Sequence, residues 1–582
     1  MQKNTTSAPR TGNAMPISDV QIQKAVATLS NALRAENIQD QSYLGLYVGE
    51  DALHDIHNLN NQVIYGRRGS GKTHLLKALQ EKINNDFAAS RRIAVYIDAR
   101  TILPHAEADG LSWEQYAVIL FKNIIRSLVN AFLSNLRAIH GRDDIIPLRR
   151  DPLDAEAERQ LQQRLEAIQR ELDGSSLNKL KETALAVESI AQAGASLKLS
   201  KAPELQASGS LQTKSQESRL KDQFISVFDI ANLLQELSEE LQLNRVFCLI
   251  DEWSEIPNSA QKHLAELVKK SFIASRFSFK IAAIPNRTDL GHKTDEKFYG
   301  LEDGGDIFGY QLDNRYVFEI DKAKTRNFFN QLLCKHLEQH SPSLSDELLL
   351  PSRKNNDAFI NAFLTNKALG ELLIASAGIP RDFINLFIHS YAQFKSSGSK
   401  HISIKNVRAA TSGWYETDKK KQVDEHSVEK NLLEKIVQEI VVGKNSSHFM
   451  ISEKYSANPH ILGLVDFRVL HLRKKGYSHK DMAGETFNVY SIDYGCYNHL
   501  NITRTALDNN TLENLKVRDD IRDIRRIHLS DAFFQKFQLA VGEAFMCEHC
   551  KKPVDTTHAA FVKQSLCNHC FEKIPARSAL AA

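Results

Sequence analysis

The sequence of 582 residues is 42% hydrophobic and 25% charged, and its formal net charge is only +3. A chain of this length can bury several hydrophobic cores, so we expect three or four domains of an ordinary soluble protein. So small a net charge gives nucleic-acid binding no support by itself. The polar start, MQKNTTSAPRTGNAMP, has no apolar segment, and no apolar run approaches the roughly 20 residues that span a bilayer. We therefore expect a cytoplasmic protein with no secretory signal and no membrane partner.

Residues 61–79, NQVIYGRRGSGKTHLLKAL, are typical of a short strand, a glycine-rich turn and the start of an amphipathic helix. They match the P-loop pattern G-x-x-x-x-G-K-[ST], which cradles nucleotide phosphates. The glycines let successive backbone N–H groups face the anion, Lys72 reaches toward the β and γ phosphates, and the Thr73 hydroxyl is placed to bind Mg²⁺. The alternative is a chance glycine-rich turn, and the elements on both sides count against it. The residues expected to bind ATP here are Gly66, Gly69, Ser70, Gly71, Lys72, Thr73 and His74.

A strand over residues 91–100, RRIAVYIDAR, follows, and then an insertion of about residues 140–222. Within it, Asp151 and Pro152 open a predicted helix whose apolar stripe includes Leu161, Leu165, Ile168 and Leu172. Residues 195–211 alternate leucine with polar residues, which suggests a loose hairpin or a flexible polar tract. The insertion is interpreted as a partner-facing arm, with a disordered linker as the alternative.

Residues 245–257, RVFCLIDEWSEIP, supply the acidic strand that a P-loop needs. Val246 to Ile250 is a continuous apolar run, as expected for the middle of a parallel sheet. Asp251 at its end can hold Mg²⁺ through water, and Glu252 can orient and deprotonate the attacking water. A strand that ends in acidic residues is a weak signal alone, but together with the P-loop it predicts ATP hydrolysis.

Three further polar residues follow in an informative order. A strand from Ile281 to Ile284 leads to Asn286, whose side chain is expected beside the strand that carries Asp251. Arg315 precedes a strand predicted to begin near Tyr316, and Arg381 opens a helix after a Gly-Ile-Pro turn. Residues 401–410 predict another helix start after a short extended piece. A lone arginine is more often a surface residue than a catalytic one, so only the order gives these residues weight.

This order of motifs resembles the AAA+ ATPases, in particular the origin-recognition and initiator-loader branch and related signalling ATPases. The resemblance covers roughly residues 40–415 and is interrupted by the insertion. It implies Lys72 and Thr73 as the Walker A motif and Asp251 and Glu252 as the Walker B motif. It further implies Asn286 as sensor 1, Arg381 as sensor 2 and, more weakly, Arg315 as an arginine finger, since Arg276 and Arg287 lie nearby. Trp253 and Ser254, which follow the acidic pair, differ from the residues that are most common at these positions in loader ATPases.

Beyond this region, ETDKKKQVDEHSVEKN is interpreted as a charged linker around Lys419 to Lys421. Helical segments, a basic turn and a β-hairpin then resemble a winged helix. Its predicted phosphate contacts are Arg468, Arg473, Lys474, Lys475 and Lys480, with Tyr477 nearby. A winged helix that binds protein through a solvated basic edge is the alternative. The segment KVRDDIRDIRRIHL predicts an exposed helix with internal ion pairs.

The last motif consists of Cys547, Cys550, Cys567 and Cys570, two C-x₂-C pairs separated by 16 residues. Four thiolates at this spacing predict a Zn²⁺ site, and the short gap cannot supply a core that folds without metal. A redox pair is the alternative, although one C-x₂-C pair would then be enough.

We therefore predict an α/β P-loop NTPase (AAA+) parallel sheet with a helical lid, followed by an α+β winged-helix-like domain and a small zinc ribbon. The predicted boundaries are 1–40 for a tail and helix, 41–325 for the core, 326–415 for the lid, 430–540 for the winged helix and 541–575 for the ribbon. The expected cofactors are ATP, Mg²⁺ and Zn²⁺, and the expected partners are DNA and further copies of the chain in a homo-oligomer. The leading hypothesis is ATP-driven assembly on DNA, in replication, mobile-element movement or phage defence. A signalling switch that binds a protein or recruits an effector protein is the alternative. A regulatory scaffold that binds ATP and hydrolyses little of it is a third hypothesis.

Overall fold

The computed structural model describes residues 15–38, 42–103, 111–134, 227–272, 275–295, 297–318, 320–348, 358–478, 484–498, 527–555 and 558–574, with 159, 160, 163, 167, 168 and 170. The chain divides into two compact units. One is Arg34–Asp313, and the other joins Met1–Leu33 with Asn314–Ala582. The predicted helix after Asp151 lies outside the described residues except for the six single ones, all helical, of which Ile168 is buried. The predicted hairpin at 195–211 and most of the predicted helix at 516–529 also lie outside them.

The core of the Arg34–Asp313 unit is a five-stranded parallel sheet. Its strand order is β2-β3-β4-β1-β7, so the strand that leads into the P-loop lies between two later strands. In the register, Asp98 pairs with Asp251 and Ile250 pairs with Ile281, which brings the carboxyl ends of β2, β3 and β4 to one edge. The strands are β1 (Gln62–Tyr65), β2 (Arg92–Asp98), β3 (Arg245–Asp251), β4 (Phe277–Ala283) and β7 (Phe308–Gln311).

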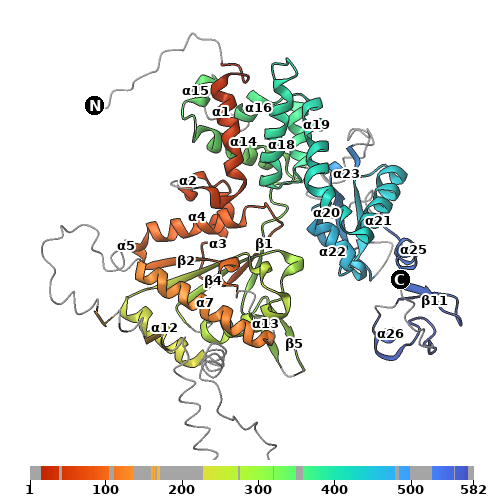
Figure 1. Ribbon diagram of the computed structural model, residues 1–582, viewed down its shortest axis with the longest axis horizontal. Coiled ribbons are helices and arrows are strands. Elements are labelled where there is room, and N and C mark those ends of the chain that lie inside the picture. The colour runs from red at the N-terminus through yellow and green to blue at the C-terminus, as the bar shows by residue number, and fades with distance from the viewer. Residues whose placement is uncertain are drawn as a thin grey trace, which may run out of the picture. The chain divides into compact units, whose positions relative to one another are not determined.

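Helices cover both faces of this sheet (Figure 1). One face packs against α3 and α4 through residues such as Leu53, Leu76 and Leu79. The other packs against α7, α12 and α13 through residues such as Phe121 and Leu264. Burial on both faces explains why β3 is a continuous apolar run. The helices are α2 (Tyr43–Leu46), α3 (Glu50–Ile56), α4 (Lys72–Asn85), α5 (Phe87–Ser90), α6 (Ala99–Ile102), α7 (Trp113–Ser134), α12 (Val227–Glu240) and α13 (Asn258–Phe272).

The strands predicted within residues 91–100, 246–250 and 281–284 are confirmed, but the strand predicted to begin near Tyr316 is wrong. The fifth strand is β7, and residues 313–316 form a turn instead. Tyr316 and Val317 are buried by packing, and the Tyr316 ring stacks on Phe328 with 3.5 Å between centroids. Their apolar character therefore reflects a core contact and not strand pairing. A small hairpin that the sequence did not predict, β5 (Gly291–Lys293) and β6 (Phe298–Gly300), lies between β4 and β7.

The second unit begins with a helical part. The first helix, α1, and the turn Leu29–Leu33 pack with helices from beyond residue 313, and Tyr391 donates a hydrogen bond to the Ile17 carbonyl at 2.6 Å. The helix start predicted within 401–410 is confirmed at Ile404, with Ser403 as its capping residue. The helices are α1 (Val20–Thr28), α14 (Lys322–Glu338), α15 (Leu344–Glu347), α16 (Ala358–Phe363), α17 (Asn366–Ala375), α18 (Pro380–Lys395) and α19 (Ile404–Trp414).

The charged linker predicted around Lys419 is wrong, because the segment is helical. A π-helix over Tyr415–Lys419 continues α19 into α20 (Lys420–Asp424), and α21 (Ser427–Ile436) follows. Lys419 is only 2% exposed, with Nζ 2.6 Å from Asp493 and 3.3 Å from Asp382. The lysine run therefore contains one buried lysine that forms two ion pairs, which composition alone did not reveal.

The winged-helix-like part follows α21. A second π-helix, Val437–Val442, leads to β8 (His448–Ser452), α22 (Pro459–Asp466) and the hairpin of β9 (Leu470–Ser478) and β10 (Thr486–Ile492). The three strands form an antiparallel sheet in the order β8-β10-β9. After α23 (Gly495–Asn498) and α25 (Asp531–Ala540), the ribbon consists of β11 (Ala544–Met546), β12 (Pro553–Asp555) and α26 (Ala559–Gln564). None of the helices described is long and apolar enough to cross a bilayer.

Candidate nucleotide site and metal centre

The turn between β1 and α4 has the geometry of a phosphate cradle. Gly69 and Gly71 have φ angles of 83° and 93°, a left-handed conformation that residues with a Cβ rarely adopt. Gly66 is needed for a different reason, because an added Cβ would lie 2.5 Å from the Ser70 Oγ. Gly71 caps α4, which begins at Lys72, so the positive end of this helix faces the turn.

Two side chains in the turn fit a bound anion. Lys72 is buried, and its Nζ donates to the carbonyl oxygens of Gly66 at 2.7 Å and Arg67 at 3.1 Å. Among the residues that the structure describes, the buried Ser70 Oγ has no hydrogen-bond partner. A buried polar atom without a partner is costly, so the Ser70 hydroxyl favours a ligand that brings oxygen atoms into the turn that also holds the Lys72 ammonium.

The acidic end of β3 lies beside this turn. Asp251 is fully buried, and its Oδ2 accepts a hydrogen bond of 2.8 Å from the hydroxyl of Tyr96 on β2. Its Oδ1 accepts the backbone N–H of Glu252, also at 2.8 Å. Tyr96 therefore fixes the orientation of the carboxylate expected to hold Mg²⁺. Sequence reasoning missed it because an inward tyrosine in a strand has the same signature as an ordinary core residue.

Glu252 has a strained backbone and an unusual electrostatic environment. Its φ of 53° is left-handed, which a glutamate adopts only where the surrounding structure enforces it. Burial raises the pKa of Glu252, and the charge of Asp251 raises it further, whereas Lys72 and Arg100 oppose both effects. Because β1 and β3 both pair with β4 in parallel, the sheet brings the P-loop and the acidic strand to the same edge. A raised pKa also suits a general base.

Two ion pairs connect the variable P-loop residues to other parts of the site. The Arg67 guanidinium lies 3.3 Å from Asp313, and the Arg67 backbone N–H donates to the same carboxylate at 3.1 Å. Arg68 pairs with Glu255, just after the acidic strand, at 2.8 Å across a more exposed surface. Sequence reasoning missed Asp313, since contact between residues so distant in the chain has no local signal.

Asn286 follows β4 directly, and His74 lies in the first turn of α4, just after the P-loop. Asn286 is in the 3-10 turn Pro285–Arg287 directly after β4, which pairs with β3. The Ser254 hydroxyl accepts the Ile284 N–H at 2.7 Å and so ties this turn to the acidic strand. The His74 Nε2 lies 2.9 Å from the Tyr43 carbonyl oxygen, and its ring meets Tyr47 edge-on. His74 thus anchors α2 onto α4.

Arg381 and Arg315 belong to the other compact unit. Arg381 is the second residue of α18, after Gly378 with φ of 80°, and its Nε donates to the Leu33 carbonyl at 3.2 Å. Arg315 lies partly buried in the turn of residues 313–316. Their roles toward a nucleotide stay predictions.

The prediction that Arg468 and Arg473 meet DNA phosphates is wrong for the described conformation, because both are 7% exposed. Arg468 forms ion pairs with Asp382 and Asp418, and the Arg473 Nε donates to the Ser491 hydroxyl at 2.8 Å. Tyr477 is also buried. The described basic side chains on β9 that reach solvent are Lys474, which is partly exposed, and Lys475, which is exposed. Lys480 lies outside the described residues.

The four terminal cysteines converge on one point. The sulfur atoms of Cys547, Cys550, Cys567 and Cys570 all lie within 4.8 Å of one another. Cys547 and Cys570 are separated by 3.8 Å, and Cys550 and Cys567 by 3.7 Å. Sulfurs bound at about 2.3 Å to one tetrahedral Zn²⁺ lie about 3.8 Å apart, so the spacing fits zinc and is too long for disulfides. The predicted ribbon fold is confirmed.

The three-layer fold, the P-loop and the acidic strand define an AAA+ P-loop ATPase. A family model described as ORC-CDC6-like matches residues 29–371, which is more than half of the chain. The chain belongs to the ORC-CDC6-like family. This confirms the resemblance to origin-recognition ATPases.

The chain also has low similarity to several solved structures. It is similar to Aeropyrum pernix ORC2 in its ADPNP-ADP complexes (TM-score 0.32, 10% identity, 88% of this chain and 96% of that chain). It is also similar to Aeropyrum pernix ORC1 in complex with DNA (TM-score 0.28, 11% identity, 85% of this chain and 94% of that chain). A third similar structure is Drosophila ORC bound to DNA (TM-score 0.27, 10% identity, 86% of this chain and 95% of that chain). These scores are too low to extend the likeness to function. No curated protein matches the sequence.

Proposed function

We propose that the protein binds ATP with Mg²⁺ and hydrolyses it, and that the bound nucleotide controls its assembly on DNA. The observation that supports this most directly is the buried Lys72 of the P-loop together with the left-handed backbone of Glu252 at the end of the acidic strand. Strain of this kind persists where the fold enforces it, and it is concentrated at functional sites.

Each residue has a defined part in the proposed reaction. Lys72 and the backbone N–H groups of the P-loop bind the phosphates, and Ser70 gains the partner that its buried hydroxyl lacks among the described residues. Thr73 and Asp251 are the residues that would hold Mg²⁺, which neutralises charge on the phosphate oxygens when bound. Glu252 accepts the proton of the attacking water, and Asn286 orients that water.

The proposed DNA contact involves the winged-helix-like part. Lys475 is exposed on β9 and Lys474 is partly exposed beside it, so both ammonium groups can reach a phosphate.

The alternative function is a signalling switch that binds a protein, and an observation on the ribbon favours it. Val562 and Phe571 are 67% and 66% exposed there, and exposed apolar side chains of this size favour a protein partner.

Two substitutions separate binding from chemistry. Lys72→Ala should abolish ATP binding, because no other buried ammonium in the described P-loop can replace it. Glu252→Gln should bind ATP normally and lose turnover, because an amide cannot accept the proton. Nucleotide binding and phosphate release measure the two steps. Lys82→Ala is the control, since Lys82 lies ten residues along the same helix, roughly 15 Å from Lys72.

If Glu252→Gln hydrolyses ATP at the wild-type rate, Glu252 is not the general base. To distinguish the two functions, phosphate release is measured with and without duplex DNA. Stimulation by DNA supports assembly on DNA, and the absence of DNA binding together with nucleotide-dependent binding of a protein supports the signalling switch.

A further inference from the structure

The segment that leads into the ribbon packs on the winged-helix-like part, within the same compact unit. This docked tail, residues 531–543, consists of α25 and the turn that follows it. The Phe534 ring stacks on Tyr455 with 3.9 Å between centroids, and the Phe537 ring meets His460 edge-on at 5.9 Å. Both phenylalanines are only 1% exposed, so α25 packs firmly on α22 and on the turn before it.

His460, in the first turn of α22, lies between two carboxylates. Its Nδ1 is 2.9 Å from a Glu429 oxygen on α21, and its Nε2 is 2.6 Å from a Glu543 oxygen at the end of the docked tail. A carboxylate only accepts hydrogen bonds, so both ring nitrogens must donate, as they do in the imidazolium form of histidine. The side chains of His460, Glu429 and Glu543 are 14%, 16% and 27% exposed, so both contacts are largely shielded from water.

The backbone around His460 supports this arrangement. Asn458 caps α22, and its side-chain oxygen accepts the His460 backbone N–H at 3.0 Å. One turn further along α22, a Cβ on Gly463 would lie 3.3 Å from the Glu429 Cγ. A glycine at this position therefore leaves room for α21 to bring the Glu429 carboxylate to the ring.

The contact with Glu543 fixes the path of the chain into the ribbon. The helix α25 ends before Gly542, whose left-handed φ of 80° turns the chain, and Glu543 follows directly. The first ribbon strand, β11, begins at the next residue, Ala544. The last side chain before the ribbon is therefore the one that His460 binds.

The electrostatic environment favours the charged ring. Burial alone would lower the pKa of His460, but its hydrogen bonds to Glu429 and Glu543 and their charges outweigh burial and raise that pKa above the ordinary 6.5. The other charged side chains around the docked tail are Lys435, over the Phe537 ring at 5.7 Å, and Lys454, which pairs with Asp531 at 2.5 Å.

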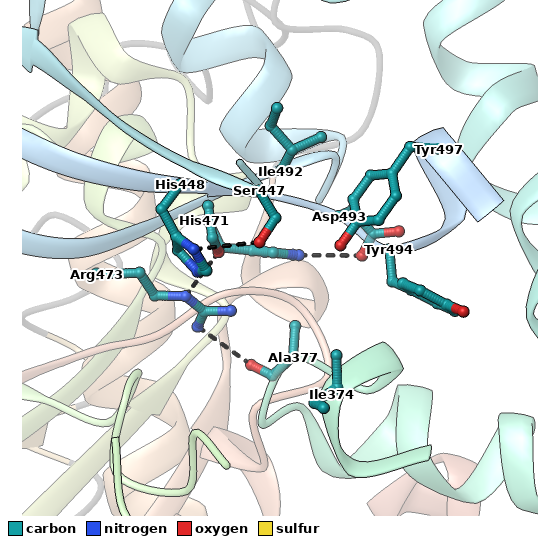
Figure 2. A pocket seen from close by; sticks show the side chains of 11 residues that line it. Ile374, Ala377, Ser447, His448, His471, Arg473, Ile492, Asp493, Tyr494 and Tyr497 are labelled. Atoms are coloured by element: carbon teal, nitrogen blue, oxygen red, sulfur yellow. Dashed lines mark hydrogen bonds and ion pairs between the residues drawn. The ribbon is translucent and has the colours of Figure 1, made fainter. Parts of the chain in front are cut away.

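The buried histidine of β9, the strand that also packs against α22, has a different environment. The His471 Nε2 lies 3.0 Å from the Asp493 Oδ2, beside a small polar cavity (Figure 2). The same oxygen accepts a hydrogen bond of 2.6 Å from the Lys419 ammonium. Asp493 therefore keeps a cation whether or not His471 is protonated, whereas a neutral His460 donates to only one of its two carboxylates.

We infer that Glu429, His460 and Glu543 form a pH-sensitive latch that holds the docked tail on α21 and α22. When His460 loses its proton, one carboxylate faces a nitrogen lone pair instead of an N–H group. The docked state is therefore fully favoured below pH 6.5 and weakens as the pH rises through the raised pKa of His460. With the latch open, the ribbon is free to follow a partner of its own. The latch does not depend on nucleotide, so its test is separate from that of the proposed ATPase function.

The test compares full-length wild type with His460→Gln, whose side chain is polar but cannot carry the charge. Hydrogen exchange of peptides that cover residues 531–543 is measured between about pH 6 and about pH 8.5, relative to the unfolded chain at the same pH. Hydrogen bonds to charged groups contribute a factor of about 10 to 100 each, so at the lowest pH the tail of the variant should exchange faster than the wild-type tail by about this factor. The ratio should fall toward one at the highest pH.

His426→Gln is the matched control. His426 directly precedes α21, and its Nδ1 lies 2.9 Å from the Gln422 carbonyl oxygen instead of a carboxylate. This variant should leave the exchange of the docked tail unchanged at every pH.

A second variant separates a titrating latch from a packing contact. Glu543→Gln removes one carboxylate and leaves His460 in place, so it should lower the pH at which the tail loses its protection, because one carboxylate raises the pKa of His460 less than two. A packing role alone would weaken docking equally at every pH. If thermal unfolding shows that His460→Gln does not fold, Glu543→Gln still gives the answer, since its side chain is at the surface.

A wild-type tail with the same protection across this pH range overturns the inference. A folded His460→Gln that keeps wild-type protection at the lowest pH also overturns it, and so does a Glu543→Gln whose midpoint does not move. None of these results bears on ATP binding, which is measured separately at the P-loop.

Discussion

The hydroxyl of Tyr96 donates a hydrogen bond of 2.8 Å to the buried Asp251 carboxylate, and no other side chain in the described part of the chain does so. Tyr96→Phe removes that one bond and leaves the ring in place. A hydrogen bond to a charged group contributes about 1.5–3 kcal/mol, so Asp251 should be less well oriented for Mg²⁺. We expect the Mg²⁺ concentration that gives half-maximal ATP hydrolysis to rise by roughly tenfold.

The control for this prediction is Tyr310→Phe. Tyr310 is on β7 of the same sheet and donates to Asp55 at 3.2 Å, away from the acidic strand. A magnesium titration of phosphate release that is the same in Tyr96→Phe and in wild type would contradict the role given to this hydroxyl.

Single residues also show what the sequence could predict about the site. Lys72, Asp251 and Glu252 are identified by local patterns, since their roles depend on neighbours within a few positions of the chain. Tyr96 and Asp313 act through partners more than a hundred residues away, Asp251 and Arg67. Only the register of β2 against β3 brings Tyr96 to Asp251, and no periodicity in the sequence encodes that register.

The π-helix of Tyr415–Lys419 is the element that the sequence described least well. Three consecutive lysines favour a solvated linker, but the wider helical turn directs Lys419 inward onto Asp382 and Asp493. Burial alone would raise the pKa of Asp493, but Lys419 and His471 outweigh it and hold that pKa well below the ordinary 3.8. The resulting stability is present above pH 3.8 and is lost as the pH falls below it.

Lys419→Ala should destabilise this unit strongly, because it leaves two buried carboxylates without their shared cation. Breaking a buried pair in this way costs about 3–5 kcal/mol. Lys421→Ala is the matched control, since Lys421 is exposed two residues later and should change the free energy of unfolding by less than about 0.5 kcal/mol. Chemical denaturation of both variants at neutral pH measures the difference, and equal midpoints would show that the buried network contributes little.

At the scale of the whole molecule, the order of the motifs predicted the class of fold, but not which segments fold together. The first 33 residues join a unit whose other residues begin at Asn314, through contacts such as Tyr391 with Ile17. Such pairing depends on packing between segments far apart in the chain, which local composition does not record. The division places Lys72 in one unit and Arg381 and Arg315 in the other.

The proposed hydrolysis needs a cation on the side of the γ-phosphate opposite Lys72, and we propose that a neighbouring copy supplies it. Arg315 is the candidate, and an arginine finger contributes roughly 10³ to 10⁵ in rate. Activity per chain should therefore rise with protein concentration, and Arg315→Ala should bind ATP normally while hydrolysing it poorly. Arg276→Ala is the comparison, because Arg276 is already engaged with the Leu243 carbonyl at 2.9 Å and should keep its activity.

Mixing two inactive variants tests whether the site is shared. Arg315→Ala contributes an intact P-loop and Lys72→Ala contributes an intact arginine, so the mixture should regain part of the wild-type phosphate release. Because Arg315 lies in the turn of residues 313–316, the thermal unfolding of Arg315→Ala must first match wild type, which separates a lost finger from a disturbed turn. If both variants fold and co-assemble without regaining activity, the finger is not Arg315. If an isolated monomer turns over ATP at a rate independent of concentration, the site is complete within one chain.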